Sequence, residues 1–544
     1  MIEYTIDEKL RAEEIQVQSN ISSLIDNGMS FYFLAGAGAG KTYALVESLK
    51  YYLNKKQNEL EKTGRKLACI TYTNAAKGEV IERLYENDNI TVSTIHSFLW
   101  GIIEHHQREL LDIHIEYLRE VISDTESSLY TDDKNSKKSG YKKFRSLEHE
   151  EKKSLLMVIE SQDESLYKLF KIKTAKDFWA DLSSLINEDI FRKLQGNRTE
   201  IEKILRDLLK IKKLRYCIKK IEEGDIKYQK INYKEIGGRE VLHRNRIGHD
   251  TLILYSHRIV NKYDILKKII LDSYPAVFID EYQDTHSQVI SLFDELLSYS
   301  KKNKLSFTLS LFGDPVQSIY SNNLNNREIK NKIEIVEKNI NRRSHKQIID
   351  CISKIRGLHQ EINQVSIYSD KKDGTVSYYI ANKSEVEPKI VIDNKISEYK
   401  DKWGISSKNK LSCMVLKNKN LSELCNFEDY YSIIEKTYQD KTSLVRFDSV
   451  NEELLSKDLT RLGSLPIAIF NIVKPLYFLT HCRQRPLTDI FSSESLESNS
   501  LENVIACLDD LRESKYQNIK SYVEDIIIKS NKESDLYSLY KNLN

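Results

Sequence analysis

A short glycine-rich segment near the start of the chain constrains the fold more than any other feature. Its residues run Phe31-Tyr-Phe-Leu-Ala-Gly-Ala-Gly-Ala-Gly-Lys-Thr42, the pattern of a buried strand, a glycine turn and the start of an amphipathic helix. Glycines let consecutive backbone N–H groups curl around a phosphate, and the helix N-terminus adds its positive dipole end. This is the context of a P-loop, in which Lys41 reaches the β/γ-phosphates and Thr42 holds Mg²⁺. The residues expected to bind a nucleoside triphosphate are Gly36, Gly38, Gly40, Lys41 and Thr42.

Length and composition limit the class of protein. A chain of 544 residues exceeds the ~250–300 residues at which a single core stops growing, so several domains are expected. Charged residues make up 30% of the chain and only 6 residues are proline, which favours a helix-rich, soluble protein. No apolar run approaches the ~18–20 residues of a membrane span, and residues 1–20 are too acidic and polar for a signal peptide.

Cysteine usage and net charge indicate the compartment and the kind of partner. The 7 cysteines are scattered, odd in number and never in a C-x-x-C pair, which argues against a disulfide framework and a zinc site. A reducing cytoplasm is the expected location. The formal net charge is only +2, so a nucleic-acid partner would have to bind a local patch.

Two segments downstream repeat the pattern of a strand followed by polar residues. Residues 274–285 form an apolar strand that ends in adjacent carboxylates, where Asp280 suits Mg²⁺ binding and Glu281 suits activation of a water molecule. Residues 307–320 form a strand that ends at Gly313 and leads to Gln317. Three such units in one sheet predict an α/β NTPase core. A glycine-rich turn that binds no nucleotide is the alternative reading of the first unit.

These segments resemble the motifs of the UvrD/Rep-like superfamily 1 helicases. The matches are residues 35–42 with motif I, Asp280-Glu-Tyr-Gln-Asp-Thr285 with motif II and Gly313-Asp-Pro-Val-Gln-Ser-Ile-Tyr320 with motif III. Ile70-Thr-Tyr-Thr-Asn-Ala-Ala76 resembles motif Ia, Ser93-Thr-Ile-His-Ser-Phe98 motif Ib and Asn341-Arg-Arg-Ser344 motif IV. All lie in family order. The resemblance implies a RecA-like P-loop fold and an ATP-dependent DNA helicase that moves 3′ to 5′ on single-stranded DNA.

The resemblance implies roles for further residues around ATP. Gln317 would sense the γ-phosphate, and Arg343 would touch it. Gln317 would also couple the γ-phosphate to the DNA-binding side. Gln283 would either take part in this coupling or position the attacking water. The family's adenine-reading glutamine corresponds to Gln16 or Gln18, and the spacing does not choose between them.

Residues of motifs Ia, Ib and III are implied to contact the DNA strand. Those of motifs Ia and Ib are Thr71, Thr73, Asn74, Thr94, His96 and Phe98. Tyr320 in motif III suits a base-stacking platform, which can contribute ~1–3 kcal/mol per base. A half-buried aromatic side chain at the sheet edge is the alternative role for Tyr320.

Departures from the family pattern bear on activity. Arg342 stands where motif IV normally carries the aromatic residue that stacks on adenine, and arginine can stack on a base plane instead. Residues 345–544 contain no segment like motif V, and Leu476-Tyr-Phe-Leu-Thr-His-Cys-Arg483 is a distant echo of motif VI. There, His481 stands in place of the arginine finger and Arg483 is displaced by two residues. Because an arginine finger can be worth roughly 10³–10⁵ in rate, we expect slow hydrolysis or a missing part supplied from elsewhere.

The expected architecture is a RecA-like core with large helical insertions. Residues 1–105 would form the first part of core subdomain 1A, 106–250 a helical 1B-like insertion and 251–340 the rest of 1A. Residues 374–381 and 411–416 read as strands, and they would begin a partial second lobe, 2A, over residues 341–420. Residues 421–544 would form a helical 2B-like region.

Two functions from different classes remain open at this stage. One is a motor that translocates on single-stranded or tailed duplex DNA, in repair or anti-phage defence. The other is a DNA-sensing regulatory ATPase subunit that acts with a partner such as a nuclease. The cations and tyrosines of residues 205–216 and 227–234 suit either DNA binding or a solvated helix face. A small-molecule kinase fails on motifs Ia, Ib, II and III together.

Overall fold

The structure is a computed structural model that divides into two compact units, residues 1–388 and 389–544. In the first unit it describes residues 4–84, 87–130, 141–172, 174–235, 240–317, 333–356, 364–370, 375–380 and 388. In the second it describes residues 389–405, 411–415, 418–439, 486–491, 493–514, 519–530 and isolated residues between 467 and 478.

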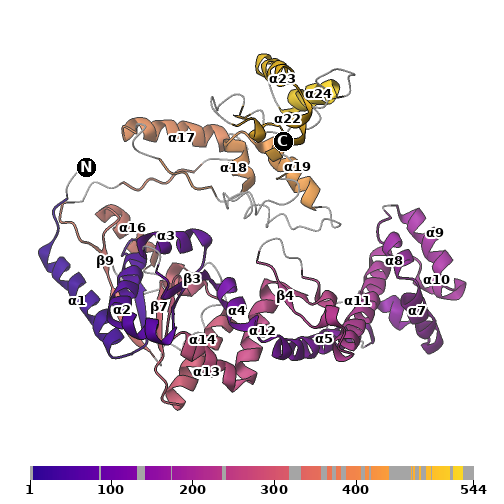
Figure 1. Ribbon diagram of the computed structural model, residues 1–544, viewed down its shortest axis with the longest axis horizontal. Helices are drawn as coiled ribbons and strands as arrows, with labels where there is room; N and C mark the ends of the chain where they lie inside the picture. The colour runs from indigo at the N-terminus through magenta and orange to yellow at the C-terminus, as the bar shows by residue number, and fades with distance from the viewer. Residues whose placement is uncertain are drawn as a thin grey trace. The chain divides into compact units, whose positions relative to one another are not determined.

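A six-stranded parallel sheet forms the centre of the first unit (Figure 1). Its strands are β1 (Phe31–Ala35), β2 (Leu67–Thr71), β3 (Ile90–Thr94), β6 (Ala276–Ile279), β7 (Thr308–Gly313) and β8 (Glu334–Lys338). Their order is β3-β2-β6-β7-β1-β8, and every neighbouring pair is parallel. The carboxyl ends of all these strands therefore lie at one edge, where ligands bind in open sheets of this kind.

Alternating side chains of the strands supply two separate cores, one on each face of the sheet. Tyr32 and Leu34 of β1 belong to one buried cluster, whereas Phe31 and Phe33 belong to the other. The first face is covered by α4 (Ile95–Ile103), α12 (His249–Lys262), α13 (Asp264–Ser273) and α14 (Ser287–Lys302). The second face is covered by α1 (Glu8–Asp26), α2 (Lys41–Thr63) and α3 (Asn74–Leu84). Because helices cover both faces, the inner strands β1, β2, β6 and β7 are buried along their whole length, whereas the edge strands β3 and β8 carry polar or charged residues. The predicted α/β class is confirmed.

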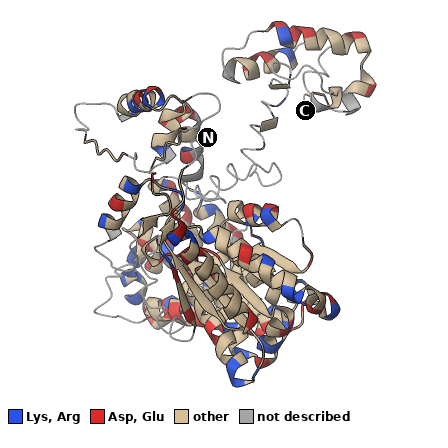
Figure 2. Ribbon diagram, turned by 90° about the vertical axis from the view of Figure 1, so that its left-hand side faces the viewer, with Lys and Arg blue, Asp and Glu red and all other residues tan. Residues whose placement is uncertain are grey.

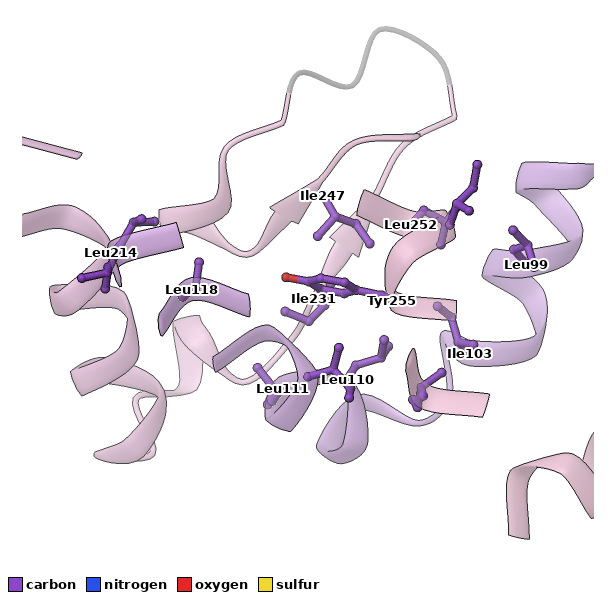
Figure 3. Close-up of a cluster of buried hydrophobic side chains, with 14 of the residues drawn as sticks. Leu99, Ile103, Leu110, Leu111, Leu118, Leu214, Ile231, Ile247, Leu252 and Tyr255 are labelled. Atoms are coloured by element: carbon purple, nitrogen blue, oxygen red, sulfur yellow. The ribbon is translucent and has the colours of Figure 1, made fainter. Parts of the chain in front are cut away.

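A helical region occupies the chain between α4 and α12. Its helices are α5 (Gln107–Tyr130), α6 (Lys142–Arg145), α7 (His149–Ser161), α8 (Asp163–Leu169), α9 (Ala175–Leu185), α10 (Glu188–Leu194) and α11 (Arg198–Glu222). The 3₁₀ turns η1 (Ile226–Tyr228) and η2 (Leu242–Arg244) and the two-stranded sheet of β4 (Asn232–Tyr233) and β5 (Arg246–Ile247) follow. Figure 3 shows side chains of α4, α5, α11 and α12 meeting around Tyr255, so this region shares a core with the sheet.

A buried polar contact holds this junction. His114 of α5 is fully buried, and its Nδ1 lies 2.7 Å from the Tyr255 hydroxyl of α12. Its Nε2 lies 3.1 Å from the carbonyl oxygen of Leu242. Burial lowers the pKa of His114 to about 4, so the ring is neutral at neutral pH.

The region after β8 departs from the predicted pattern. β9 (Ile340–Asn341) and β10 (Val365–Ser366) form a two-stranded parallel sheet, with α16 (Lys346–Arg356) between them in the chain. Residues 375–380 and 411–415 were expected to be strands, and this expectation is wrong for the described residues, which have no regular structure there. Both segments have the apolar residues of strands, but a strand forms only where a neighbouring strand pairs with its backbone groups. Val376 and Tyr378 are instead 56% and 87% exposed.

The named elements of the second unit are helical, as was predicted for residues 421–544 but not for the preceding residues, where a strand was expected. They are α17 (Pro388–Lys402), α18 (Asn418–Leu424), α19 (Glu428–Gln439), η7 (Leu487–Asp489), α22 (Ser493–Ser498), α23 (Leu501–Glu513) and α24 (Ile519–Ser530). A small core of its own contains Phe491, Cys507 and Tyr522. Among the described residues, no helix is long and apolar enough to cross a membrane. The predicted subdomain boundaries stay predictions.

Charge is distributed evenly over the helices. Figure 2 shows Lys and Arg beside Asp and Glu on the helices, whereas the strands of the central sheet are mostly uncharged. This agrees with the small net charge of the sequence.

We predict that Tyr255→Phe lowers the melting temperature by several degrees. The change leaves His114 Nδ1 buried without its hydroxyl partner, which costs about 1–3 kcal/mol. Differential scanning fluorimetry measures the effect. Tyr263→Phe is the matched control, because the Tyr263 hydroxyl bonds Asp112 at an exposed site. Equal melting temperatures for the two variants would contradict a structural role for the His114 contact.

Candidate nucleotide site

The glycine loop between β1 and α2 has a backbone that favours glycine. Gly38 and Gly40 have φ values of 80° and 86°, in the left-handed region that L side chains rarely adopt. Space is also limited, since a Cβ atom on Gly38 would lie 2.8 Å from Nδ2 of Asn341. The loop therefore requires glycine at Gly38 for two independent reasons.

Lys41 starts α2 and lies beside the ends of two other strands. Its side chain is 9% exposed, and Nζ donates a hydrogen bond to Oε1 of Gln317 at 2.8 Å. The same nitrogen lies 3.8 Å from Oε2 of Glu281. The predicted phosphate-binding lysine, γ-phosphate sensor and catalytic base are thus brought together.

The two carboxylates after β6 have different environments. Asp280 is 4% exposed, and its Oδ1 accepts a hydrogen bond from the backbone N–H of Glu281 at 3.1 Å. Burial, followed by the nearby charge of Glu281, raises the pKa of Asp280 to about 6. Glu281 has a φ of 46°, an unusual conformation for a non-glycine residue that costs of order ~1–3 kcal/mol. Backbone strain of this kind is common at functional sites.

Gln283 connects the segments after β6 and β7. Its Nε2 donates to Oε2 of Glu281 at 2.7 Å, and its Oε1 accepts from the backbone N–H of Asp314 at 2.9 Å. A Cβ atom on Gly313 would lie only 2.5 Å from Gln283 Oε1, so this approach also depends on a glycine. Gln283 thus links Glu281 to the segment that follows β7, and its two predicted roles stay predictions.

The other side of the glycine loop meets the end of β8 and the turn after β9. The backbone N–H of Arg342 donates to the carbonyl oxygen of Gly38 at 3.2 Å. Arg343 lies close to the loop as well, because a Cβ atom on Gly38 would be 3.1 Å from the Cβ of Arg343. Both predicted arginines are therefore next to the P-loop.

A cluster of charged side chains links the end of β8 and the turn after β9 to α1. The sequence did not predict this cluster. Glu14 accepts hydrogen bonds from the Arg342 guanidinium, with Nε at 2.9 Å, and from Nζ of Lys338 at 2.7 Å. Lys338 is 5% exposed, and its Nζ lies 3.6 Å from the Cβ position of Gly40. Burial opposes ionisation of Glu14, but the hydrogen bonds from Arg342 and Lys338 hold its pKa down to about 2. The guanidinium predicted to stack on adenine is thus anchored by a carboxylate.

The two candidate glutamines lie on the same helix as Glu14. Gln16 is exposed, and its Nε2 donates to Oδ1 of Asn20 at 2.9 Å. Gln18 is half-buried. Which of the two reads adenine stays a prediction.

The motif Ia residues lie at the carboxyl end of β2. Thr71 is buried, and its hydroxyl donates to the carbonyl oxygen of Thr73 at 3.2 Å. Thr73 Oγ1 accepts from the backbone N–H of Ala76 at 3.1 Å, in the first turn of α3. Thr73 and Asn74 are exposed at this edge of the sheet.

The motif Ib residues are engaged by the helical region. Thr94 caps α4, and its hydroxyl donates to Oε1 of Glu235 at 2.8 Å, while the Ser97 hydroxyl donates to Oε2 at 2.7 Å. Burial acts to raise the pKa of Glu235, but these hydrogen bonds outweigh it and lower the pKa. Sequence reasoning missed Glu235, because nothing in its local pattern links it to residues so far upstream.

His96 and Phe98 differ in accessibility. The His96 ring packs against His249 with centroids 4.4 Å apart, and burial, with the nearby His249, lowers its pKa to about 4. Phe98 is 3% exposed and packs against Phe293 and Tyr274. Because its side chain is buried, Phe98 cannot contact a DNA strand, and this prediction is wrong.

Comparison with known proteins assigns the family. A family model described as the UvrD/REP helicase N-terminal domain matches residues 18–335, more than half of the chain. The chain belongs to the UvrD/Rep helicase family. The α/β core with its P-loop is accordingly RecA-like, and the resemblance drawn from the motifs is confirmed.

Individual relatives of this UvrD/Rep chain differ in how much of it they cover. It is 34% identical over 519 residues to the Gabija protein GajB of Bacillus cereus (strain HuB5-5), spanning 95% of this chain and 73% of that protein. It is 23% identical over 509 residues to a probable DNA helicase II homolog of Mycoplasma capricolum, spanning 88% and 60%. A shorter match of 124 residues, 36% identical, links it to the RecBCD enzyme subunit RecB of Buchnera aphidicola, of which it covers 9%.

The residues present fit the ATP and divalent metal that the UvrD/Rep family uses. Mg²⁺ is usually bound by one or two carboxylates together with substrate phosphates, rather than by an all-protein cage. Asp280 and the half-buried hydroxyl-bearing Thr42 are such a set. Among the described residues, no group of three or more His, Cys, Asp or Glu is arranged to hold a metal ion.

The basic stretch of α11 is largely occupied by contacts within the chain. Lys212 Nζ donates to the carbonyl oxygens of Ile159 and Glu160, and Arg215 pairs with Glu126. Lys220 pairs with Glu223 at 2.8 Å. These contacts favour the solvated helix face over a DNA-binding patch at these cations.

Two predicted features of this helicase lie outside the described residues. One is Tyr320, the expected stacking platform of motif III. The other is the motif VI-like pair of His481 and Arg483. Their roles stay predictions.

We predict that Glu14→Gln destabilises the protein in a pH-dependent way. Because the pKa of Glu14 falls from 4.5 to about 2 on folding, its ion pairs contribute at most about 3 kcal/mol above pH 4.5. That contribution is lost as the pH falls from 4.5 towards 2. The difference in melting temperature between the unmodified chain and Glu14→Gln should be constant from about pH 7 to pH 5. It should become smaller as the pH falls below 5.

The exposed neighbour Glu13 provides the matched control, as Glu13→Gln on the same helix. A Glu14→Gln chain that melts like the Glu13→Gln chain at neutral pH would show that the cluster adds no stability.

Proposed function

We propose that this chain is an ATP-dependent helicase or translocase that acts on single-stranded or tailed duplex DNA, in DNA repair or anti-phage defence. The contact between Lys41, Gln317 and Glu281 carries the proposal. It joins the phosphate-binding helix to the segments that follow β6 and β7, and the predicted DNA-contact motifs follow the neighbouring strands β2 and β3.

The residues of the site divide the work of hydrolysis. Lys41 binds the β/γ-phosphates, and Mg²⁺, when bound by Asp280 and Thr42, neutralises charge on the phosphates. Glu281 accepts a proton from the attacking water, and Gln283 holds the carboxylate of Glu281 through its 2.7 Å hydrogen bond. Gln317 changes partner when a γ-phosphate reaches Lys41, and this change is the signal to the DNA-binding edge.

A second function, the DNA-sensing ATPase subunit, is supported by a specific observation. The sequence from residue 345 onward has no segment like motif V, and the arginine of motif VI is replaced or displaced. One relative is named as a subunit of the RecBCD enzyme, although the match covers 9% of it. A chain of this kind would bind ATP and DNA and require a partner, such as a nuclease, for turnover.

The first test of the proposed function is ATP hydrolysis with and without single-stranded DNA. We predict that Lys41→Ala lowers the rate by about 10²-fold or more, because the site loses the charge that faces the phosphates. A phosphate-release assay measures it. Lys50→Ala is the matched control, since Lys50 lies on the same helix at a partly exposed position paired with Glu47. Hydrolysis that survives Lys41→Ala would come from another site.

Glu281→Gln should separate binding from turnover. General-base catalysis contributes about 10²–10⁴-fold, so hydrolysis falls by that factor while ATP and DNA still bind. Fluorescence anisotropy of labelled single strands with ATP present measures the retained complex. Normal hydrolysis by Glu281→Gln would exclude Glu281 as the base.

Unwinding distinguishes the motor from the subunit. A motor chain separates a 3′-tailed duplex when it is alone with ATP and Mg²⁺, and it does so faster than a 5′-tailed one. A subunit shows ATP binding and slow hydrolysis alone, and its activity appears when a partner nuclease is added.

A further inference from the structure

Asn341, at the end of β9, has a side chain that is fully buried between the P-loop and the arginine turn. Its Nδ2 donates to the carbonyl oxygen of Ala37 at 2.8 Å and to Oε1 of Gln364 at 3.3 Å. Its Oδ1 accepts from the backbone N–H groups of Arg343 and Ser344, both at 2.9 Å. A primary amide has two N–H donors and one oxygen with two lone pairs, so its hydrogen-bonding capacity is fully used.

The network also fixes which way the amide of Asn341 points. Two backbone N–H groups face Oδ1, and two oxygens face Nδ2, so the reversed orientation would oppose donors to donors and acceptors to acceptors. Gln364 is 5% exposed, and its Oε1 is one of those acceptors, whereas its Nε2 is buried with no hydrogen-bond partner. The amide therefore has a single favourable orientation.

The contact with Ala37 brings the arginine turn directly onto the glycine loop. Ala37 lies inside the loop, between Gly36 and Gly38, and the backbone N–H of Arg342 adds a second bond to Gly38 at 3.2 Å. A larger residue at Gly38 would displace both the Asn341 amide and the Cβ of Arg343. The Asn341 side chain and the backbone N–H of Arg342 thus together hold the arginine turn against the phosphate-binding loop, and Asn341 also binds the backbone of Arg343.

We infer that Asn341 is a positioning residue for ATP hydrolysis, which holds Arg343 against the P-loop so that its guanidinium and Lys41 face the same triphosphate. The inference rests on the proposed ATPase function. Asn341 touches the loop carbonyl and the Arg343 backbone rather than substrate, so its contribution to the rate passes through Arg343.

A double-mutant cycle on Asn341→Ala and Arg343→Ala tests this dependence. Single-turnover hydrolysis of labelled ATP gives the rate, and competition with a fluorescent nucleotide gives the affinity for ATP. We expect Asn341→Ala to lower the rate about tenfold or more in the chain that keeps Arg343, with ATP affinity changed by less than about threefold. In the Arg343→Ala background the same change should lower the rate by less than about twofold, because the residue it positions is gone.

The opposite pattern overturns the inference. If Asn341→Ala lowers the rate by the same factor in both backgrounds, Asn341 acts independently of Arg343. An unchanged rate in the chain that keeps Arg343 overturns it as well. Asn339→Ala, an exposed amide two residues earlier, is the matched control and should leave the rate unchanged.

A second variant covers the case in which Asn341→Ala fails to fold. Gln364→Leu removes one partner of the Asn341 amide and keeps Asn341 itself. It is combined with Arg343→Ala in the same double-mutant cycle, and we expect a smaller loss of rate than for Asn341→Ala. Equal effects in both backgrounds again overturn the inference. Lys41→Ala is measured beside each chain. If the unmodified chain hydrolyses no more ATP than Lys41→Ala, the proposed ATPase function fails, which is distinct from a failure of the cycle.

Discussion

The nucleotide site depends on the position of β1 between β7 and β8 in a sheet whose strands are all parallel. Parallel strands present their carboxyl ends at one edge, so the loop after β1 has a neighbouring chain segment on each side. On one side Lys41 meets Gln317 and Glu281, and on the other Asn341 meets Ala37. The loop requires glycine at Gly38, because this residue adopts a positive φ and must leave room for Asn341.

Several charged side chains lie at the carboxyl edge of the sheet, where they are buried or partly buried. Asp280 is held with a raised pKa, Glu281 has a left-handed backbone conformation, and Lys41 is nearly inaccessible. Perturbed titration and backbone strain together are typical of sites where binding a charged ligand compensates an unfavourable ground state. A nucleoside triphosphate with its cation would supply opposite charge to each of these groups. On the other side of the glycine loop, Glu14 forms ion pairs with both Lys338 and Arg342.

The helical region between α4 and α12 is part of the same core as the sheet and contacts the segment that follows β3. Glu235, which follows β4, accepts hydrogen bonds from the hydroxyl groups of Thr94 and Ser97 in motif Ib. Much of the cationic surface on α11 is consumed by pairs within the chain. Of the residues predicted to contact the DNA strand, Thr73 and Asn74 are exposed after β2.

The sequence by itself determined the family and the α/β class, because each motif is a short run in which a strand, a turn and a polar tip follow one another. Local order of this kind needs no partner elsewhere in the chain. The sequence also predicted residues of the nucleotide site, of which Lys41, Glu281, Gln283 and Gln317 lie close together in the structure. The sequence did not reveal the burial of Phe98 or the pairing of Glu14 with Lys338. The expected strands at residues 375–380 and 411–415 were wrong. Only the tertiary structure decided these points, because strand pairing, burial and ion pairing depend on residues far away in sequence. Asn341 and Ala37 are 304 positions apart, and only the folded sheet brings them within a hydrogen bond of each other.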